Sequence, residues 1–186
     1  MGTIILIRPT FMKTLQLNPP IGLGYLAAFL EKKSHKVILI DCRTNEFSND
    51  DIIKIIKKYK PKIVGLTALT VYYEEMRELC RYIHVKREGF DSKNKFLLII
   101  GGVHVSALPE LSLAECKADL AVLGEGEVTL LDLIEKLDKN ENYYDIDGIA
   151  YFKNGEFKVN KPRELVKDIN TIPFPAWHLI PPNKYP

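Results

Sequence analysis

Five short, uninterrupted apolar runs, each followed by a helical pattern, constrain the fold of this chain more than any other feature. The runs cover residues 3–7, 36–41, 63–67, 96–100 and 120–123. A strand with one wet face alternates apolar and polar residues, so continuous runs are typical of strands buried on both faces. Crossovers of about a dozen residues or more between strands favour parallel pairing. The sequence therefore predicts an α/β fold with a buried, mostly parallel sheet.

The segments between these runs carry apolar residues at helical spacing. The first helix is expected from Gly22, with its apolar stripe on Leu23, Leu26, Ala27 and Leu30. Similar stripes mark residues 52–59, 76–83 and 130–137, and a short helix is expected over 109–116. Asn49 or Asp50 is expected to cap the second helix. Five such strand–helix units favour a flavodoxin-like, Rossmann-like doubly wound sheet of five parallel strands in the order 2-1-3-4-5.

The pattern changes after residue 140. Asn154-Gly155 lies between two strand-like segments, 146–152 and 156–160, and Asn-Gly in this setting is a strong hairpin signal. Six of the 11 prolines fall within residues 162–186, which predicts an extended tail. We therefore expect an α/β domain over 1–140, a β-hairpin appendage over 141–161, and a Pro-rich linker over 162–186. The chain stops in this linker, so we expect a piece of a longer protein.

Composition excludes several classes of protein. The net charge is only +2 with scattered basic residues, so no nucleic-acid partner is expected. No apolar run approaches the roughly 20 residues of a membrane span, and no signal peptide is recognisable, so we expect a cytoplasmic protein without a membrane partner. Cys42, Cys80 and Cys116 are far apart, which predicts neither a disulfide framework nor a metal site.

The carboxyl ends of the predicted strands are the expected ligand site, as in other open parallel sheets. The turns there are rich in glycine and hydroxyl residues, which allow a close approach of backbone and provide polar contacts. Thr67 and Thr70 follow the third strand, Gly101-Gly102 the fourth, and Gly124-Glu125-Gly126 the fifth. The glycines can also be explained as tight strand exits, and His104 as a hydrogen-bonded structural residue. No catalytic motif such as GxSxG or HExxH occurs, so no catalytic residue is predicted.

A dinucleotide site is the main alternative that the residues themselves suggest. Residues 22–27 match GxGxxA, and Asp41 stands near the spacing expected of a ribose-binding acid. However, the Rossmann turn requires its first glycine directly after the first strand, and here the loop of residues 8–20 intervenes. A helix packed closely against a neighbour explains Gly22 and Gly24 better. No P-loop motif is present.

Five motifs in order resemble one known family. They are residues 19–28 (PPIGLGYLAA), 101–104 (GGVH), 124–127 (GEGE), 146–151 (IDGIAY) followed by Asn154-Gly155, and 172–177 (IPFPAW). Together they resemble the N-terminal B12-binding domain of cobalamin-dependent radical SAM proteins, a group similar to the magnesium-protoporphyrin oxidative-cyclase-like family. Each motif is weak alone, but the resemblance covers nearly the whole chain.

The resemblance implies a cofactor and a partner domain. Cobalamin is expected to lie with its corrin over the carboxyl edge of the sheet and its nucleotide tail among the strand-end loops. In the full-length protein, a radical SAM domain would carry a 4Fe-4S cluster on CxxxCxxC and bind S-adenosylmethionine, for methyl transfer or oxidative cyclisation. This chain contains no CxxxCxxC, so alone it is expected not to catalyse a reaction.

The loop after the first strand sets one further expectation. Cobalamin mutases carry a DxHxxG motif there, whose histidine ligates cobalt, but residues 8–20 contain no histidine. We therefore expect the corrinoid to bind base-off and without a histidine lower ligand. The alternatives that stay open are a non-catalytic interaction or regulatory domain with an unoccupied pocket, and a nucleotide-binding domain.

The candidate cofactor-binding residues come from these motifs and from loop positions; no metal ligand is predicted. The motifs and the strand ends give Pro20, Gly22, Leu23, Asp41, Gly101, Gly102, Val103, His104, Gly124, Glu125 and Gly126. Loop position after the first and third strands adds Thr10, Phe11, Met12, Thr67, Leu69 and Thr70.

Overall fold

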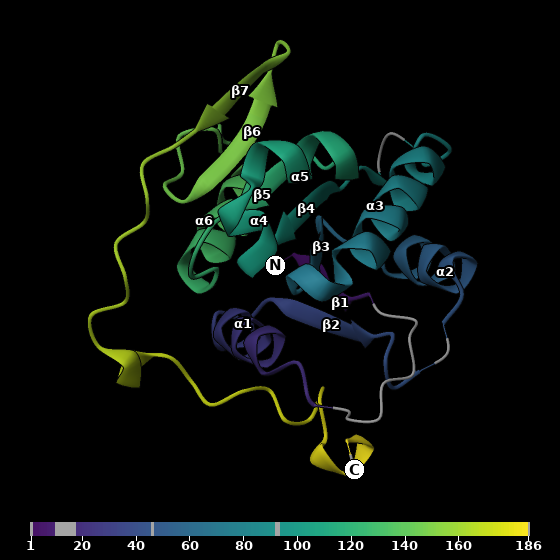
Figure 1. The fold of residues 1–186 in the computed structure, drawn as a ribbon. Coiled ribbons are helices and arrows are strands. Elements are labelled where there is room, and N and C mark those ends of the chain that lie inside the picture. Colours follow the sequence, from purple (N-terminus) through teal and green to yellow (C-terminus); the bar gives the residue numbers. More distant parts are fainter. Residues whose placement is uncertain (1, 10–17, 46, 92–93, 186) are drawn as a thin grey trace.

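A single mixed sheet forms the centre of the protein. The structure is a computed structural model that describes residues 2–9, 18–45, 47–91 and 94–185. Within these residues the sheet has seven strands in the order β2-β1-β3-β4-β5-β6-β7 (Figure 1). The strands are β1 (Thr3–Arg8), β2 (Lys36–Asp41), β3 (Ile63–Thr67), β4 (Leu97–Gly101), β5 (Leu120–Val122), β6 (Ile149–Lys153) and β7 (Glu156–Val159). The first five pair in parallel, which confirms the predicted order 2-1-3-4-5.

Helices cover both faces of the parallel part of the sheet. They are α1 (Ile21–Lys32), α2 (Asn49–Tyr59), α3 (Tyr73–Arg87), α4 (Val103–Ala107), α5 (Pro109–Cys116) and α6 (Glu127–Lys139). Helices α1 and α6 share one apolar cluster with the sheet, and α2, α3 and α5 share the other. Within the part of the chain that the structure describes, no helix is long and apolar enough to cross a bilayer.

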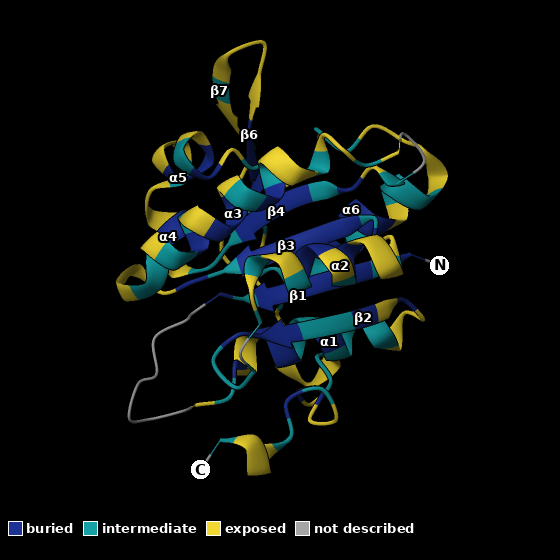
Figure 2. Ribbon diagram, turned by 90° about the vertical axis from the view of Figure 1, so that its right-hand side faces the viewer, coloured by how far each residue is buried: buried dark blue, intermediate teal, exposed yellow. Residues whose placement is uncertain are grey.

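Burial on both faces explains why the strand sequences are continuously apolar. In β1, Ile4 and Leu6 enter the cluster under α1 and α6, whereas Ile5 and Ile7 enter the cluster under α2 and α3. Figure 2 shows the buried residues concentrated in the central strands and the exposed ones on the outer sides of the helices. The two apolar clusters therefore hold the sheet as the middle layer of three.

Three local features differ from the sequence prediction. Helix α2 is capped by Ser48, whose Oγ accepts from the Asp51 amide at 3.2 Å, while the Asp51 carboxylate accepts from the Ser48 amide at 3.2 Å. This capping box satisfies two end amides at once, so Ser48 replaces the expected Asn49 or Asp50. The segment after Gly102 forms the additional short helix α4. The predicted hairpin is present, and its strands β6 and β7 extend the same sheet in antiparallel pairing.

The Pro-rich tail packs against α1 instead of running free. Ile180 is fully buried, and the Ala176 amide donates to the Gly24 carbonyl at 3.0 Å. A Cβ atom on Gly24 would lie 2.6 Å from Ile180 Cδ1 and 3.1 Å from Pro175 Cβ, so a larger residue would displace the tail side chains from this position. The expectation of close packing is therefore right for Gly24. It does not apply to Gly22, where a Cβ atom would meet nothing within 4 Å.

The tail contact gives a stability prediction. Replacing Ile180 with alanine removes buried apolar contacts and opens a gap beside Gly24, so we expect Ile180→Ala to lower the free energy of unfolding by about 2 to 4 kcal/mol. Urea denaturation followed by circular dichroism measures this change. The control is Phe174→Ala in the same tail, where the side chain is 87% exposed and the expected change is under about 0.5 kcal/mol. Equal, negligible effects of both substitutions would show an undocked tail.

Candidate functional site

A cavity of about 720 Å³ opens at the carboxyl ends of the parallel strands. Its walls come from the segments that follow β1, β3, β4 and β5, and from the first turns of α1 and α6. These turns lie at one edge of the sheet because β1 to β5 run parallel and nearly in register. The side chains of the described residues do not fill this cavity, which leaves room for a ligand at the position that open parallel sheets use.

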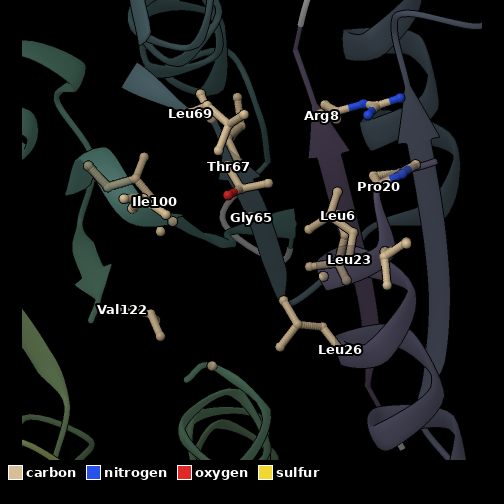
Figure 3. Close-up of a pocket in the computed structure, with 18 of the residues that line it drawn as sticks. Leu6, Arg8, Pro20, Leu23, Leu26, Gly65, Thr67, Leu69, Ile100 and Val122 are labelled. Atoms are coloured by element: carbon tan, nitrogen blue, oxygen red, sulfur yellow. The ribbon is translucent and has the colours of Figure 1, made fainter. Parts of the chain in front are cut away.

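The inner end of the cavity is an apolar slot between α1 and α6. Figure 3 shows the side chains of Leu6, Leu26 and Val122 around an open space beside Gly65 on β3. A Cβ atom on Gly65 would lie 3.2 Å from Leu6 Cδ2 and 3.3 Å from Ile99 Cγ1. The absence of a side chain at Gly65 therefore leaves this space between Leu6 and Ile99 open. We call this part the apolar slot; it is formed by Leu6, Leu26, Gly65, Ile99, Val122 and Leu130.

Glycines shape the rim of the cavity in different ways. Gly102 has a φ of +99°, and a Cβ atom there would lie 2.5 Å from Thr67 Oγ1, so both conformation and space require glycine. Gly124 has a φ of +68°, and its amide donates to Ser106 Oγ at 3.0 Å. At Gly22 and Gly124 a Cβ atom would meet nothing within 4 Å, so the backbone there borders open space. A ligand can therefore approach the main chain directly at these two turns.

One wall of the cavity carries a fixed positive charge. Arg8 donates from Nε to Asp41 Oδ1 at 2.8 Å and from a terminal nitrogen to Asp41 Oδ2 at 2.5 Å. Its other terminal nitrogen donates to the Asn18 carbonyl oxygen at 2.7 Å. Such a bidentate pair with a carboxylate fixes the plane of the guanidinium. Arg8 therefore offers its remaining N–H groups from a set position.

Two carboxyl groups follow β5 on the opposite side. Glu125 and Glu127 both line the cavity, and Glu125 Oε2 accepts from the Val166 amide at 3.3 Å. Burial raises the pKa of the Glu127 carboxyl; hydrogen bonds from its own and the Gly126 backbone amides oppose the rise, and the Glu125 charge adds to it. Backbone amides at the start of α6 thus hold the Glu127 carboxyl, and the Val166 amide of the tail holds that of Glu125.

Most of the predicted site residues meet at this cavity. Eleven of them line it: Pro20, Gly22, Leu23, Thr67, Leu69, Gly101, Gly102, Val103, Gly124, Glu125 and Gly126. Asp41, Thr70 and His104 do not line the cavity. Thr10, Phe11 and Met12 lie outside the described residues.

The structure gives Asp41 and His104 other surroundings. Asp41 is 3% exposed, and its carboxylate accepts from Arg8, from the Arg43 amide at 3.1 Å and from the Tyr185 hydroxyl at 2.7 Å. The His104 ring is 9% exposed and stacks on Tyr73, with 3.9 Å between the ring centroids. Asp41 therefore contacts the cavity wall through Arg8 and the Arg43 amide. His104 is a buried residue stacked on Tyr73, but its Nε2 has no hydrogen-bond partner among the described residues, so the expectation of a hydrogen-bonded histidine is not met.

Sequence reasoning missed several residues that line the cavity. Gly65 carries a usable signal, since a glycine inside an apolar strand marks a close approach of another group. Arg8 also stands out as a charged residue directly at the end of a buried strand. Leu26 and Leu130 carry no such signal, because their helical spacing is the same as that of any core leucine.

Comparison with known proteins adds a family to this geometry. The B12 binding domain family matches residues 8–134. The solved structure of OxsB, a cobalamin-dependent S-adenosylmethionine radical enzyme with aqua-cobalamin and S-adenosylmethionine bound, superposes with a TM-score of 0.83 at 27% identity; the match covers 95% of this chain and 24% of OxsB. The methyltransferase TsrM from Kitasatospora setae matches with a TM-score of 0.74 at 20% identity, over 93% of this chain and 31% of TsrM, which shows a shared fold.

Curated relatives agree with the family match. Uncharacterized methyltransferase PH0819 of Pyrococcus horikoshii is 38% identical over 169 residues, which are 90% of this chain and 35% of that protein. The anaerobic magnesium-protoporphyrin IX monomethyl ester cyclase of Rubrivivax gelatinosus is 31% identical over 175 residues, covering 90% of this chain and 30% of the cyclase. The chain thus spans about a third of the length of these relatives. By this family match and the cavity at the strand ends, the chain belongs to the B12-binding domain family.

Proposed function

We propose that this domain binds cobalamin base-off, with the detached lower base in the apolar slot, and serves a radical SAM domain in a longer protein. The observation that carries the proposal is the lining of the cavity, which combines a rim of glycine-bearing turns with the apolar slot. Cobalamin has two parts of matching kind: a broad macrocycle edged with polar amides, and a small, flat base on a flexible tether.

The chemistry of the two regions separates the two parts of the cofactor. Leu6, Ile99 and Leu130 in the slot are nearly fully buried and offer no polar side-chain atom. A buried amide without a hydrogen-bond partner is unfavourable there, whereas an apolar ring gains from leaving water. The rim instead presents backbone at Gly22 and Gly124 and the guanidinium of Arg8. We therefore assign the slot to the base and the rim to the amide-bearing macrocycle.

The positions of the histidines support a cobalt without imidazole from this chain. His35 accepts from the Gly2 amide at 3.3 Å, and His84 lies 3.1 Å from a terminal nitrogen of Arg87. His104 stacks on Tyr73, and His178 lies 3.2 Å from Glu31 at the outer side of α1. These are the four histidines of the sequence, all are described, and none lines the cavity.

The rest of the proposed protein follows from its relatives. Cobalamin supplies a cobalt centre that can carry a methyl group. OxsB is a cobalamin-dependent radical enzyme, and the curated relatives include a methyltransferase and a cyclase. We infer methyl transfer or oxidative cyclisation for the whole protein, with the 4Fe-4S cluster and S-adenosylmethionine on a separate radical SAM domain. The role of this chain is to hold the corrinoid and exclude water from its lower side.

The nucleotide alternative has less support. The GxGxxA segment lies inside α1, which begins at Ile21, and its second glycine, Gly24, faces the tail residues Pro175 and Ile180. A phosphate-binding turn requires these glycines at the strand-to-helix junction, where their backbone amides point at the ligand. Asp41 is likewise engaged by Arg8 and Tyr185.

Titration with hydroxocobalamin is the first test. We expect a 1:1 change of the visible spectrum and a rise in thermal stability, because a ligand that binds only the folded state stabilises it. NAD and FMN serve as controls and are expected to leave the melting temperature unchanged. No response to cobalamin at high micromolar concentration would favour the interaction-domain alternative, and a response to NAD or FMN would favour the nucleotide-binding one.

The lower ligand can be read from the reduced complex. We expect the electron paramagnetic resonance spectrum of bound cob(II)alamin to lack nitrogen superhyperfine splitting, because neither the lower base nor a histidine of this chain coordinates cobalt. Free cob(II)alamin at neutral pH, which is base-on, is the reference. Nitrogen splitting in the bound form would contradict the assignment, because either the lower base or a histidine would then coordinate cobalt.

Filling the slot tests where the base lies. Gly65→Val places two methyl groups between Leu6 and Ile99, and we expect cobalamin affinity to fall tenfold or more, about 1.4 kcal/mol. Cobinamide lacks the lower base and is the matched control, so its affinity should not change. Gly65→Ala is a milder second variant, and circular dichroism checks that both fold. Equal losses for cobalamin and cobinamide would place the base elsewhere.

A further inference from the structure

A carboxylate connects the C-terminal tail to the wall of the cavity. The hydroxyl of Tyr185 donates to Asp41 Oδ2 at 2.7 Å, and the same carboxylate holds both Nε and a terminal nitrogen of Arg8. The Arg8 guanidinium carbon also lies 5.9 Å from the centre of the Tyr185 ring. Tyr185 and Arg8 are 177 positions apart in the sequence (185 − 8). Tyr185, near the C-terminal end of the described residues, therefore contacts Arg8 at the end of β1 through the buried carboxylate of Asp41.

Burial makes this connection stiff. Asp41 is 3% exposed, and a buried carboxylate needs hydrogen bonds to all of its accessible lone pairs. Its partners are Arg8, the Arg43 amide and Tyr185. Burial and the bond to Asp41 raise the pKa of Tyr185, which keeps the phenol protonated and donating at neutral pH. Loss of the phenol would leave Oδ2 with Arg8 as its remaining side-chain partner and would admit water.

Arg8 passes this constraint to the cavity. It lines the wall itself, and it donates to the carbonyl of Asn18, which also lines the wall, at 2.7 Å. The guanidinium plane is set by the two bonds to Asp41, so a shift of the carboxylate moves both the charge and the Asn18 contact. By contrast, Tyr185 does not line the ligand site itself, and the hydrogen-bonded path from its hydroxyl to the wall runs through Asp41 and Arg8.

We propose that Tyr185 and Asp41 are positioning residues that hold Arg8 in the cavity wall, and that they couple docking of the C-terminal segment to ligand binding. The identity of the ligand as a corrinoid rests on the proposed function. Coupling between two sites is reciprocal, so a ligand that engages Arg8 stabilises the docked tail by the same factor by which the docked tail favours the ligand. The segment that leads onward from this domain thereby responds to occupancy of the cavity.

A purely adhesive tail is the competing explanation. Ile180 and Ala176 already fix the segment to α1, and His178 adds a contact with Glu31 at 3.2 Å. If the tail acted only by packing against α1, loss of any tail contact would weaken ligand binding to the same extent. His178→Ala is thus the matched control: it removes one polar contact of the same segment that does not reach Asp41 or the cavity wall.

Hydroxocobalamin titration of the 186-residue chain tests the coupling. We expect Tyr185→Phe to weaken binding about three- to tenfold, on the order of the net contribution of one typical hydrogen bond, and His178→Ala to leave it unchanged. In an Arg8→Gln background, Tyr185→Phe should have no further effect, since the relay is already broken. Independent, additive losses in this double-mutant cycle, or equal losses for Tyr185→Phe and His178→Ala, would overturn the proposal.

A measurement without ligand separates this proposal from the proposed function. The Arg8 Nε–H group donates to a buried carboxylate, so in nitrogen-15 NMR its signal should exchange slowly with water in the parent protein and in His178→Ala. We expect fast exchange in Tyr185→Phe. Slow exchange in Tyr185→Phe would overturn the relay even if cobalamin binds. Absence of cobalamin binding, with fast exchange in Tyr185→Phe alone, would refute the corrinoid assignment and leave the relay intact.

Discussion

Parallel pairing of β1 to β5 is the constraint on which the site depends. In this register Arg8 stands beside Asp41, Thr67 beside Gly101, and Gly101 beside Val122, so consecutive strands end at one edge. The turns that follow must then crowd together, although they are distant in sequence. An antiparallel sheet would send alternate turns to opposite edges. The two apolar clusters enforce the register, because a strand that slips by one residue would exchange the side chains it presents to the two clusters.

The sequence alone predicts the parts of the protein that obey a period or a turn rule. Continuous apolar runs predict the parallel strands, helical stripes predict their crossovers, and Asn154-Gly155 predicts the hairpin. Turn glycines such as Gly102, which has a positive φ, can also be recognised from the sequence, because glycine adopts this conformation readily. These signals are local, so they locate the rim of the cavity without showing its depth. Ser48 was missed as a cap because three neighbouring residues all suit that position.

The slot and the tail could not be predicted because both depend on contacts between distant segments. Leu26 and Leu130 look like ordinary core residues, and only the gap over Gly65 turns their inner sides into a cavity wall. Prolines indicate an extended tail but not the surface to which it docks. The docking surface depends on the close approach of Gly24 and Ile180, two residues separated by almost the whole chain. A period measured within one helix contains no information about such a pair.

The tail joins α1 and the cavity wall through contacts of different kinds, and the difference decides what each can transmit. Ile180 against Gly24 is an apolar contact, which is non-directional and tolerates small sliding. It therefore fixes the tail on α1 without fixing the orientation of Arg8. The bonds among Tyr185, Asp41 and Arg8 weaken steeply when distance or angle changes. These bonds are buried, so water replaces a broken one poorly. A displacement of Tyr185 therefore shifts Asp41 and, with it, Arg8.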